Sequence, residues 1–164
     1  MVGDSRTGHI ASCSNSTRGI MAGGEAPSRV NTITYITINT LGNGIDFGDL
    51  IAVRNDQDAV ASQTRGFVVA GSTGSITNLI DFVTITSTGN AQDFGDLTDA
   101  RDPGVFSSLT RGVACSGDYP SNVNIIDFIE IMTTANAVDF GDMLTKTSSP
   151  QTCSNAHGGL ADDM

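Results

Sequence analysis

The strongest constraint on the fold of this chain is a five-residue motif that occurs three times at nearly constant spacing. Asp-Phe-Gly-Asp-Leu occupies residues 46–50 and 93–97, and Asp-Phe-Gly-Asp-Met occupies residues 139–143, so successive copies lie 47 and 46 residues apart. A period in this range is typical of solenoids, propellers and other repeat architectures. We therefore interpret the motif as an architectural element that recurs once in each structural unit.

The first three letters of the motif also occur in the magnesium-binding motif of protein kinases. A kinase needs a glycine-rich phosphate loop, a lysine on a strand and a separate catalytic loop in addition. The single lysine of this chain is Lys146, which follows the last motif. A catalytic aspartate is needed once rather than three times, so the kinase interpretation is excluded.

Other positions repeat in register with the motif. Thr-Arg-Gly begins at Thr17, Thr64 and Thr110, and glycines, asparagines and isoleucines follow at matching offsets. The register shifts by one residue between Leu97 and Thr110, which places a one-residue deletion in a loop. We expect a single repeat domain over residues 1–164, with units at about 8–57, 58–103 and 104–150 and a partial fourth unit at 151–164.

Each unit contains four short segments that are typical of strands. The first consists of small residues, at 10–14, 59–63, 105–109 and 151–155, and the second follows each Arg-Gly pair and closes on a glycine. The third reads NTITYITI, NLIDFVTI or NIIDFIEI. Because strand side chains alternate between two faces, its apolar residues on both faces predict burial between two neighbouring sheets. The fourth segment carries the motif, and the low aromatic and charged content also favours an all-β fold.

Four antiparallel strands in about 40 to 50 residues describe a propeller blade, and the residues carry a resemblance as well. The order Arg-Gly, three apolar residues, Gly, then Asn-x-Ile-x-Tyr/Phe and Asp-Phe-Gly-Asp resembles the kelch repeat, and most closely the kelch-like repeats of marine bacteriophage structural proteins, over residues 8–159. Two departures are that only Gly23-Gly24 is a true di-glycine and that Phe replaces Trp. The resemblance implies three four-stranded antiparallel kelch-like propeller blades.

In this interpretation the motif residues are structural. The phenylalanines fill the space between neighbouring blades, the glycines let another strand approach closely, and the aspartates accept backbone hydrogen bonds or pair with the repeated arginines. Calcium or another hard cation is the alternative partner of the aspartates, although we expect no metal and no cofactor. The repeated structural residues are Arg18, Arg65, Arg111, Asp46, Phe47, Gly48, Asp49, Asp93, Phe94, Gly95, Asp96, Asp139, Phe140, Gly141 and Asp142.

The charge pattern excludes several classes of function. The formal net charge is −10 and the basic residues are scattered singly, which argues against nucleic-acid and membrane binding. The first ten residues lack the basic and apolar regions of a signal peptide, so we expect synthesis in a host cytoplasm. Cys13, Cys115 and Cys153 form neither a disulfide framework nor a zinc pattern, and no catalytic set can be assembled, so we expect no enzyme.

Three blades should not stand alone, because closed propellers usually have four to eight blades. We therefore expect a homo-oligomer, in which two copies supply six blades or three copies form a trimer on a phage appendage, or contact with other virion proteins. The leading functional hypothesis is a non-enzymatic phage virion structural protein in a tail fibre, an appendage or a capsid decoration. The alternative is a propeller module that binds a protein or a host-surface glycan through its variable loops, and its candidate ligand-binding residues are Arg29, Asp102, Asp118 and Tyr119.

Overall fold

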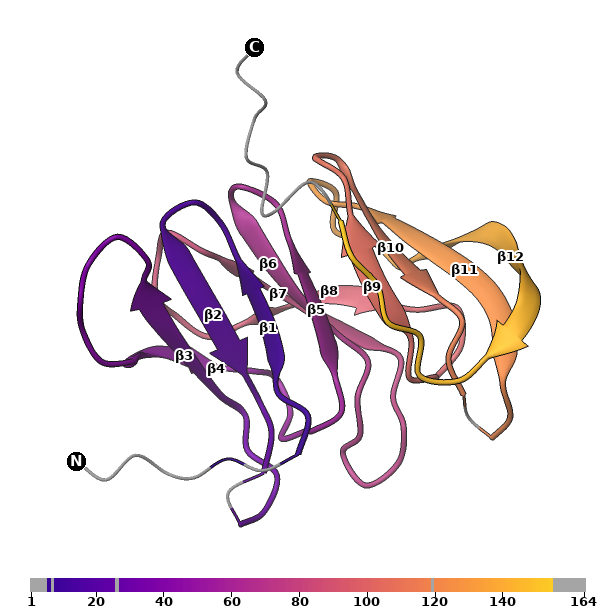
Figure 1. The fold of residues 1–164 in the computed structure, drawn as a ribbon, viewed down its shortest axis with the longest axis horizontal. Coiled ribbons are helices and arrows are strands. Elements are labelled where there is room, and N and C mark those ends of the chain that lie inside the picture. The colour runs from indigo at the N-terminus through magenta and orange to yellow at the C-terminus, as the bar shows by residue number, and fades with distance from the viewer. Residues whose placement is uncertain (1–5, 7, 26, 119, 155–164) are drawn as a thin grey trace.

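The computed structural model is all-β and consists of three four-stranded antiparallel sheets that stand side by side (Figure 1). It describes residues 6, 8–25, 27–118 and 120–154. We call the sheets blade 1, blade 2 and blade 3, in chain order, because their arrangement is propeller-like. No helix occurs among the described residues, and none of them therefore forms a helix that could span a membrane.

Every blade has the same strand order, in which consecutive strands are neighbours. Blade 1 contains β1 (Ala11–Ser14), β2 (Arg18–Ala22), β3 (Thr32–Thr37) and β4 (Ile45–Asp49). Blade 2 contains β5 (Asp58–Ala61), β6 (Arg65–Val69), β7 (Leu79–Thr84) and β8 (Gln92–Asp96). Blade 3 contains β9 (Gly104–Ser107), β10 (Arg111–Cys115), β11 (Val123–Glu130) and β12 (Val138–Thr147).

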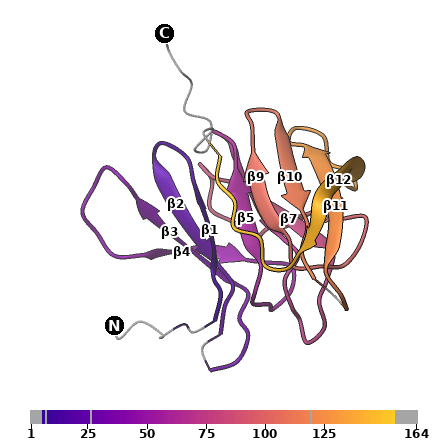
Figure 2. The ribbon, with the colours of Figure 1, turned by 45° about the vertical axis from the view of Figure 1, so that its right-hand side comes forward.

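The first strands of the three blades form the inner side of the array. β1 lies beside β5 and β5 lies beside β9, while the second, third and fourth strands extend outward (Figures 1 and 2). These first strands are only four residues long and rich in Ala and Ser. Small side chains suit this position because neighbouring blades approach each other most closely there.

The two hydrophobic cores lie between the blades. One core joins blade 1 to blade 2, and the other joins blade 2 to blade 3. The central third strand, β7, is accordingly buried on both faces, as its two-sided apolar pattern predicts. The third strand of blade 1 has one exposed face, where Ile36 is 39% exposed, because no further blade covers it.

The motif strand contains a β-bulge in every blade. In blade 1, Ile33 pairs with Gly48 and Thr34 pairs with Asp46, so Phe47 is the extra residue. Phe94 and Phe140 hold the same position in the ladders of the other two blades. A bulge re-aims the side chain of its extra residue, which explains how the motif directs one phenylalanine per blade away from the regular alternation.

The fourth small-residue segment, predicted as a strand at 151–155, differs from the prediction. Residues Gln151–Ser154 are not assigned to a strand, and Asn155 lies outside the described residues. The segment runs back from β12 to lie beside β9, where Thr152 Oγ1 donates a hydrogen bond to the Val105 carbonyl at 2.6 Å (Figures 1 and 2). The three inner strands each pair with the second strand of their own blade, and no second strand follows this segment among the described residues.

Candidate functional site

The contact between successive blades is the most highly repeated feature of the molecule. We call the side of a blade that carries the motif phenylalanine its rear face, and the side that receives the phenylalanine of the preceding blade its front face. At the first contact, Phe47 is 2% exposed and lies in one core with Val68, Val83 and Ile85 of blade 2. At the second contact, Phe94 is 1% exposed and lies in one core with residues of blade 3.

Backbone hydrogen bonds fix the motif of blade 1 against the loop between β7 and β8. The Gly89 amide donates to the Phe47 carbonyl at 2.7 Å, and the Ala91 amide donates to the Asp49 carbonyl at 2.8 Å. The Asp49 amide donates to Asn90 Oδ1 at 3.1 Å. The edge of one blade is therefore tied directly to the next blade.

The same bonds recur between blades 2 and 3, where the Ala137 amide donates to the Asp96 carbonyl and the Asp96 amide donates to Asn136 Oδ1. The motif glycine makes this approach feasible. A Cβ atom added to Gly48 would lie 2.4 Å from the Gly89 carbonyl oxygen, and one added to Gly95 would lie 2.6 Å from the Ala135 carbonyl oxygen. Both glycines also have a positive φ that other residues rarely adopt.

The repeated arginines link the blades in a way that the sequence did not indicate. Arg18 stacks on the Tyr35 ring, with its guanidinium carbon 4.5 Å from the ring centroid, and donates to the Ile85 carbonyl of blade 2 at 2.8 Å. Arg65 stacks on Phe82 and donates to the Ile131 carbonyl of blade 3 at 2.8 Å. The interpretation that these arginines pair with the motif aspartates is therefore wrong.

The motif aspartates instead serve local backbone geometry. Asp93 Oδ1 accepts a hydrogen bond from the Gly95 amide at 3.1 Å, and Asp139 Oδ1 accepts one from the Gly141 amide at 3.0 Å. The described residues contain no group of three or more His, Cys, Asp or Glu side chains arranged to hold a metal ion. Asp93 and Asp139 thus act as acceptors within their own bulges.

Two fully buried ion pairs were missed by the sequence interpretation. Arg54 Nη2 lies 3.1 Å from Asp81 Oδ1, and Arg101 Nη1 lies 2.9 Å from Asp127 Oδ2, with all four side chains fully buried. Each arginine comes from the linker that enters the blade, and each aspartate lies on the third strand of that blade. Burial raises the pKa of Asp81 above its ordinary value, although the Arg54 charge opposes this shift.

The entry to blade 1 uses the same arrangement without the carboxylate. Arg6 Nη1 donates to the Gly23 and Thr32 carbonyls, each at 3.2 Å, and Arg6 Nη2 donates to Thr34 Oγ1 at 3.3 Å. Thr34 is the repeat counterpart of the buried aspartates. Each blade is therefore braced by an arginine that precedes its first strand.

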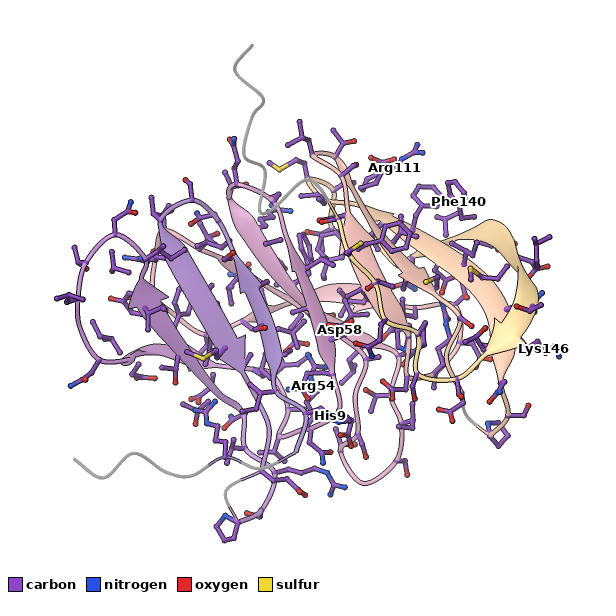
Figure 3. All side chains as sticks on the ribbon, viewed as in Figure 1. His9, Arg54, Asp58, Arg111, Phe140 and Lys146 are labelled. Atoms are coloured by element: carbon purple, nitrogen blue, oxygen red, sulfur yellow. The ribbon has the colours of Figure 1, made fainter. Side chains whose placement is uncertain are left out.

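Blade 3 carries one surface of a further blade contact, and this surface is open. Phe140, on the rear face of blade 3, is 58% exposed, and a Cβ atom added to Gly141 would meet nothing within 4 Å. Arg111 stacks on Phe128 but donates to Glu130 Oε1 at 2.8 Å instead of to a next blade. Figure 3 places Arg111 and Phe140 close together at the end of the array.

The opposite end of the array carries the complementary surface. Met21, Ile36 and Ile38 lie on the front face of blade 1 and are 36%, 39% and 49% exposed. Their repeat counterparts in blade 2 are Val68, Val83 and Ile85, which are the buried residues that receive Phe47. The two ends of the molecule thus present the two halves of one kind of contact.

The variable loops and the linkers between blades gather on one side of the molecule, below the strands in Figure 1. Asn55 and Ser72 exchange backbone hydrogen bonds, and the Asp102 amide donates to the Asp118 carbonyl at 3.3 Å. Arg29 Nε donates to Asn55 Oδ1 at 2.9 Å, so this candidate ligand residue is held against the linker between blades 1 and 2. Asp102 and Asp118 come together, whereas Tyr119 lies outside the described residues.

An open concavity of about 640 Å³ runs along the inner strands. It is lined by parts of β1, β5 and β9 and by residues 149–154, with His9, Asp56, Asp58 and Asp102 among its lining residues. His9 Nδ1 lies 3.2 Å from Asp56 Oδ1, and His9 and Asp58, both labelled in Figure 3, line the concavity. Polar and acidic groups therefore concentrate where the inner strands meet the loop side.

Burial shifts the pKa of three groups that line this concavity, namely Asp58, Asp102 and Cys13. Burial is the main cause that raises the pKa of Asp58 and of Asp102, and for Asp102 the charges of Asp56 and Asp118 add to the effect. Burial also raises the pKa of the Cys13 thiol to about 12. A thiol with such a pKa is protonated at neutral pH and is a poor nucleophile.

Replacing Asp102 with asparagine should stabilise the fold at pH 7 by up to about 1 kcal/mol, because the ionised carboxylate is partly buried beside like charges. The raised pKa means that this gain is present above the folded-state pKa of Asp102. The gain should vanish as the pH falls below the ordinary value of 3.8. Urea denaturation at pH 7 and at pH 3 measures both effects.

The control for this variant is Asp99→Asn, because Asp99 is an exposed carboxylate in the same linker. Asp99→Asn should leave the urea midpoint unchanged at both pH values. If Asp102→Asn were less stable than the parent chain at pH 7, or equally stabilised at pH 3, the ionised Asp102 carboxylate would not be the cause of the destabilisation.

Comparisons with known proteins identify no relative of this chain: no protein-family model and no curated protein matches it. The candidate sites are therefore defined by the contacts of the chain itself. Two surfaces stand out, namely the pair of open blade faces and the polar concavity beside the loops.

Proposed function

We propose that this chain is a non-enzymatic structural protein of a phage virion, in which the blades act as an assembly module. The observation that carries the proposal is the open rear face of blade 3. Phe140 is 58% exposed there, whereas its two counterparts at the internal contacts are 2% and 1% exposed. Proteins normally cover an apolar surface of this kind by association.

The use of the repeated side chains supports a structural role. Phe47 and Phe94 pack between blades, and Arg18 and Arg65 donate hydrogen bonds to the next blade. The motif residues Asp93 and Asp139 accept hydrogen bonds within their own bulges. The resemblance to kelch-like phage repeats supplies the setting, which is a tail fibre, an appendage or a capsid decoration assembled in the host cytoplasm.

Mass spectrometry of gradient-purified particles tests the virion assignment. The particles of the phage that encodes this chain should contain it in a constant ratio to the major capsid protein. An abundant non-structural phage protein from the same lysate serves as the control for carry-over and should be depleted by purification. Particles that lack the chain, or contain no more of it than of this control, would contradict the proposal.

The polar concavity favours a second candidate function, which is binding of a host-surface glycan or protein. Its volume of about 640 Å³ is in the range of small-molecule sites, and the acceptor groups of Asp58 and Asp102 face the same space. Asp118 and Arg29 lie on the adjoining loop side. In this function the ligand would be recognised by hydrogen bonds to carboxylates. The sequence adds Tyr119, which lies outside the described residues, as the candidate for stacking on a sugar ring.

A glycan array tests this second function with the purified chain. Binding should fall at least about tenfold in Asp102→Ala and in Tyr119→Ala, since each removes a direct contact. Asp142→Ala is the matched control, because Asp142 is an exposed carboxylate on β12, away from the concavity. An array without hits, or hits unchanged in both loop variants, would contradict glycan binding at this surface.

A further inference from the structure

We propose that the rear face of blade 3 binds the front face of blade 1 in a second copy of this chain, so that two copies close a six-bladed ring. The inference rests on the assembly role proposed above, and it adds the identity of the partner and of the contact. The contact is the one already made twice inside the chain, between blades 1 and 2 and between blades 2 and 3.

The apolar parts of the two open faces match the internal contacts. At the first internal contact, Phe47 packs in one core with Val68, Val83 and Ile85. The repeat counterparts of these three residues are Met21, Ile36 and Ile38 on blade 1, all of which are exposed. Phe140 of one copy can therefore enter an apolar surface of the same chemical type on the other copy.

The polar groups match as well. The loop of blade 1 carries Gly42, Asn43 and Gly44 in the positions of Gly89, Asn90 and Ala91. In the second copy, the Gly44 amide is placed to donate to the Asp142 carbonyl, and Asn43 Oδ1 is placed to accept from the Asp142 amide. These are the bonds that Ala91 and Asn90 make to Asp49.

Arg111 supplies a further bond across the contact. Its counterparts Arg18 and Arg65 stack on an aromatic ring and donate to Ile85 and Ile131 in the next blade. Arg111 has the same stacking contact, on Phe128, and its exposed side chain is held by Glu130. In the second copy, the matching acceptor is the Ile38 carbonyl, which follows from the repeat alignment.

The number of copies follows from the geometry of propellers. A contact between two different faces builds a ring if the rotation closes and a filament if it does not. Closed propellers usually have four to eight blades. Two copies supply six blades, whereas three copies supply nine, so two copies are the arrangement that fits a closed ring.

The segment at residues 150–154 lies beside β9 and would compete with the second copy for this place. It lies beside β9 in the same way that β5 lies beside β1 and β9 lies beside β5. The approach is close, because a Cβ atom added to Gly104 would lie 2.6 Å from Thr152 Cγ2. The first strand of an incoming blade 1 needs the same place. The incoming β1 is held to its own β2 by a ladder of four residue pairs, so the less firmly held 150–154 segment must yield.

The first test is the mass of the purified full-length chain by light scattering on a sizing column over a concentration series. The mass should rise from 17.0 kDa to twice that value as the concentration increases. Phe140→Asp should weaken this association at least about 30-fold, because it places a charge at the centre of the contact. Leu109→Asp is the matched control, since Leu109 is 56% exposed and its counterparts Ser16 and Gln63 are exposed at the internal contacts.

The second test is a chain that ends at Ser149. Removal of the competing segment should strengthen the association about 5- to 10-fold, which corresponds to the loss of roughly one competing hydrogen bond. Thr152→Ala should move the association in the same direction. Far-UV circular dichroism must match the parent chain for every variant, so that a loss of association reflects the contact rather than the fold.

Several results would overturn the proposal. These are a mass of 17.0 kDa at all concentrations for both the full-length and the shortened chain, a dimer that Phe140→Asp leaves intact, and trimers or polymers in place of a dimer. If Leu109→Asp also abolished the dimer, the contact between the copies would lie elsewhere. None of these results bears on whether the chain is found in purified particles, so the two proposals fail independently.

Discussion

Replacing Asp127 with alanine is expected to lower the free energy of unfolding by about 3–5 kcal/mol, because it leaves the Arg101 guanidinium buried without its counter-charge. Arg101 and Asp127 are both fully buried, and their closest atoms are 2.9 Å apart. Asp127 also accepts hydrogen bonds from the Thr98 amide and hydroxyl, so the variant removes these contacts to the segment that follows β8 as well. Urea denaturation of the monomeric chain measures the loss.

A double variant distinguishes the effect of losing the ion pair from the cost of leaving one buried charge without a partner. Arg101→Met combined with Asp127→Leu removes both charges and should recover much of the stability, since buried ion pairs are often replaceable by apolar residues of similar volume. At the entry to blade 1, Arg6 faces the uncharged Thr34, but Arg6 is only half-buried, whereas Arg101 is fully buried. A single Asp127→Ala variant that unfolds at the same urea concentration as the parent chain would contradict the bracing role of the pair.

Replacing Phe94 with alanine is expected to cost about 3–5 kcal/mol, whereas the same change at Phe140 should cost no more than about 1 kcal/mol. The two residues occupy the same position of the same motif. Phe94 is 1% exposed and contacts the Phe67 and Phe82 rings edge-on, with centroids 5.0 and 5.7 Å away. Phe140 has a similar edge contact only with Phe128, at 5.8 Å, and is 58% exposed.

The comparison of Phe94→Ala with Phe140→Ala must be made at a concentration where the chain is monomeric, since association covers Phe140 in our account. Thermal or urea denaturation then reports the internal contact alone. The mutant Phe47→Ala should resemble Phe94→Ala, because Phe47 is 2% exposed at the other internal contact. Equal losses at Phe94 and Phe140 would show that the motif stabilises its own blade rather than the contact between blades.

Much of the fold can be predicted from the sequence because a repeat offers several copies of each signal. The three motifs fix the period, and the Gly-terminated apolar segments fix four strands in each unit. The predicted all-β fold with three four-stranded antiparallel sheets is confirmed. The strand at residues 151–155 was the exception, because a small-residue segment forms a ladder only when a second strand is present to pair with it.

The polar contacts were harder to predict, because the repetition of a charged residue does not indicate which residue it contacts. The repeated Arg18 and Arg65 suggested pairing with the motif aspartates, but both reach backbone carbonyls of the next blade. The buried carboxylates lie at Asp81 and Asp127, which interrupt apolar third strands where blade 1 has Thr34. A charge in a strand predicted to be buried on both faces needs a partner, and Arg54 and Arg101 precede these aspartates by 27 and 26 residues.

In the proposed ring, the open ends of two copies of the chain form a third copy of the internal blade contact. Residue-resolved amide exchange by NMR, at monomeric and at associated concentrations, tests it most directly. The exposed Gly44 amide should gain protection on association and approach that of Ala91 and Ala137, which donate to the motif carbonyls at 2.8 Å. A Gly44 amide that exchanges equally fast at both concentrations, while Ala91 and Ala137 stay protected, would contradict the account.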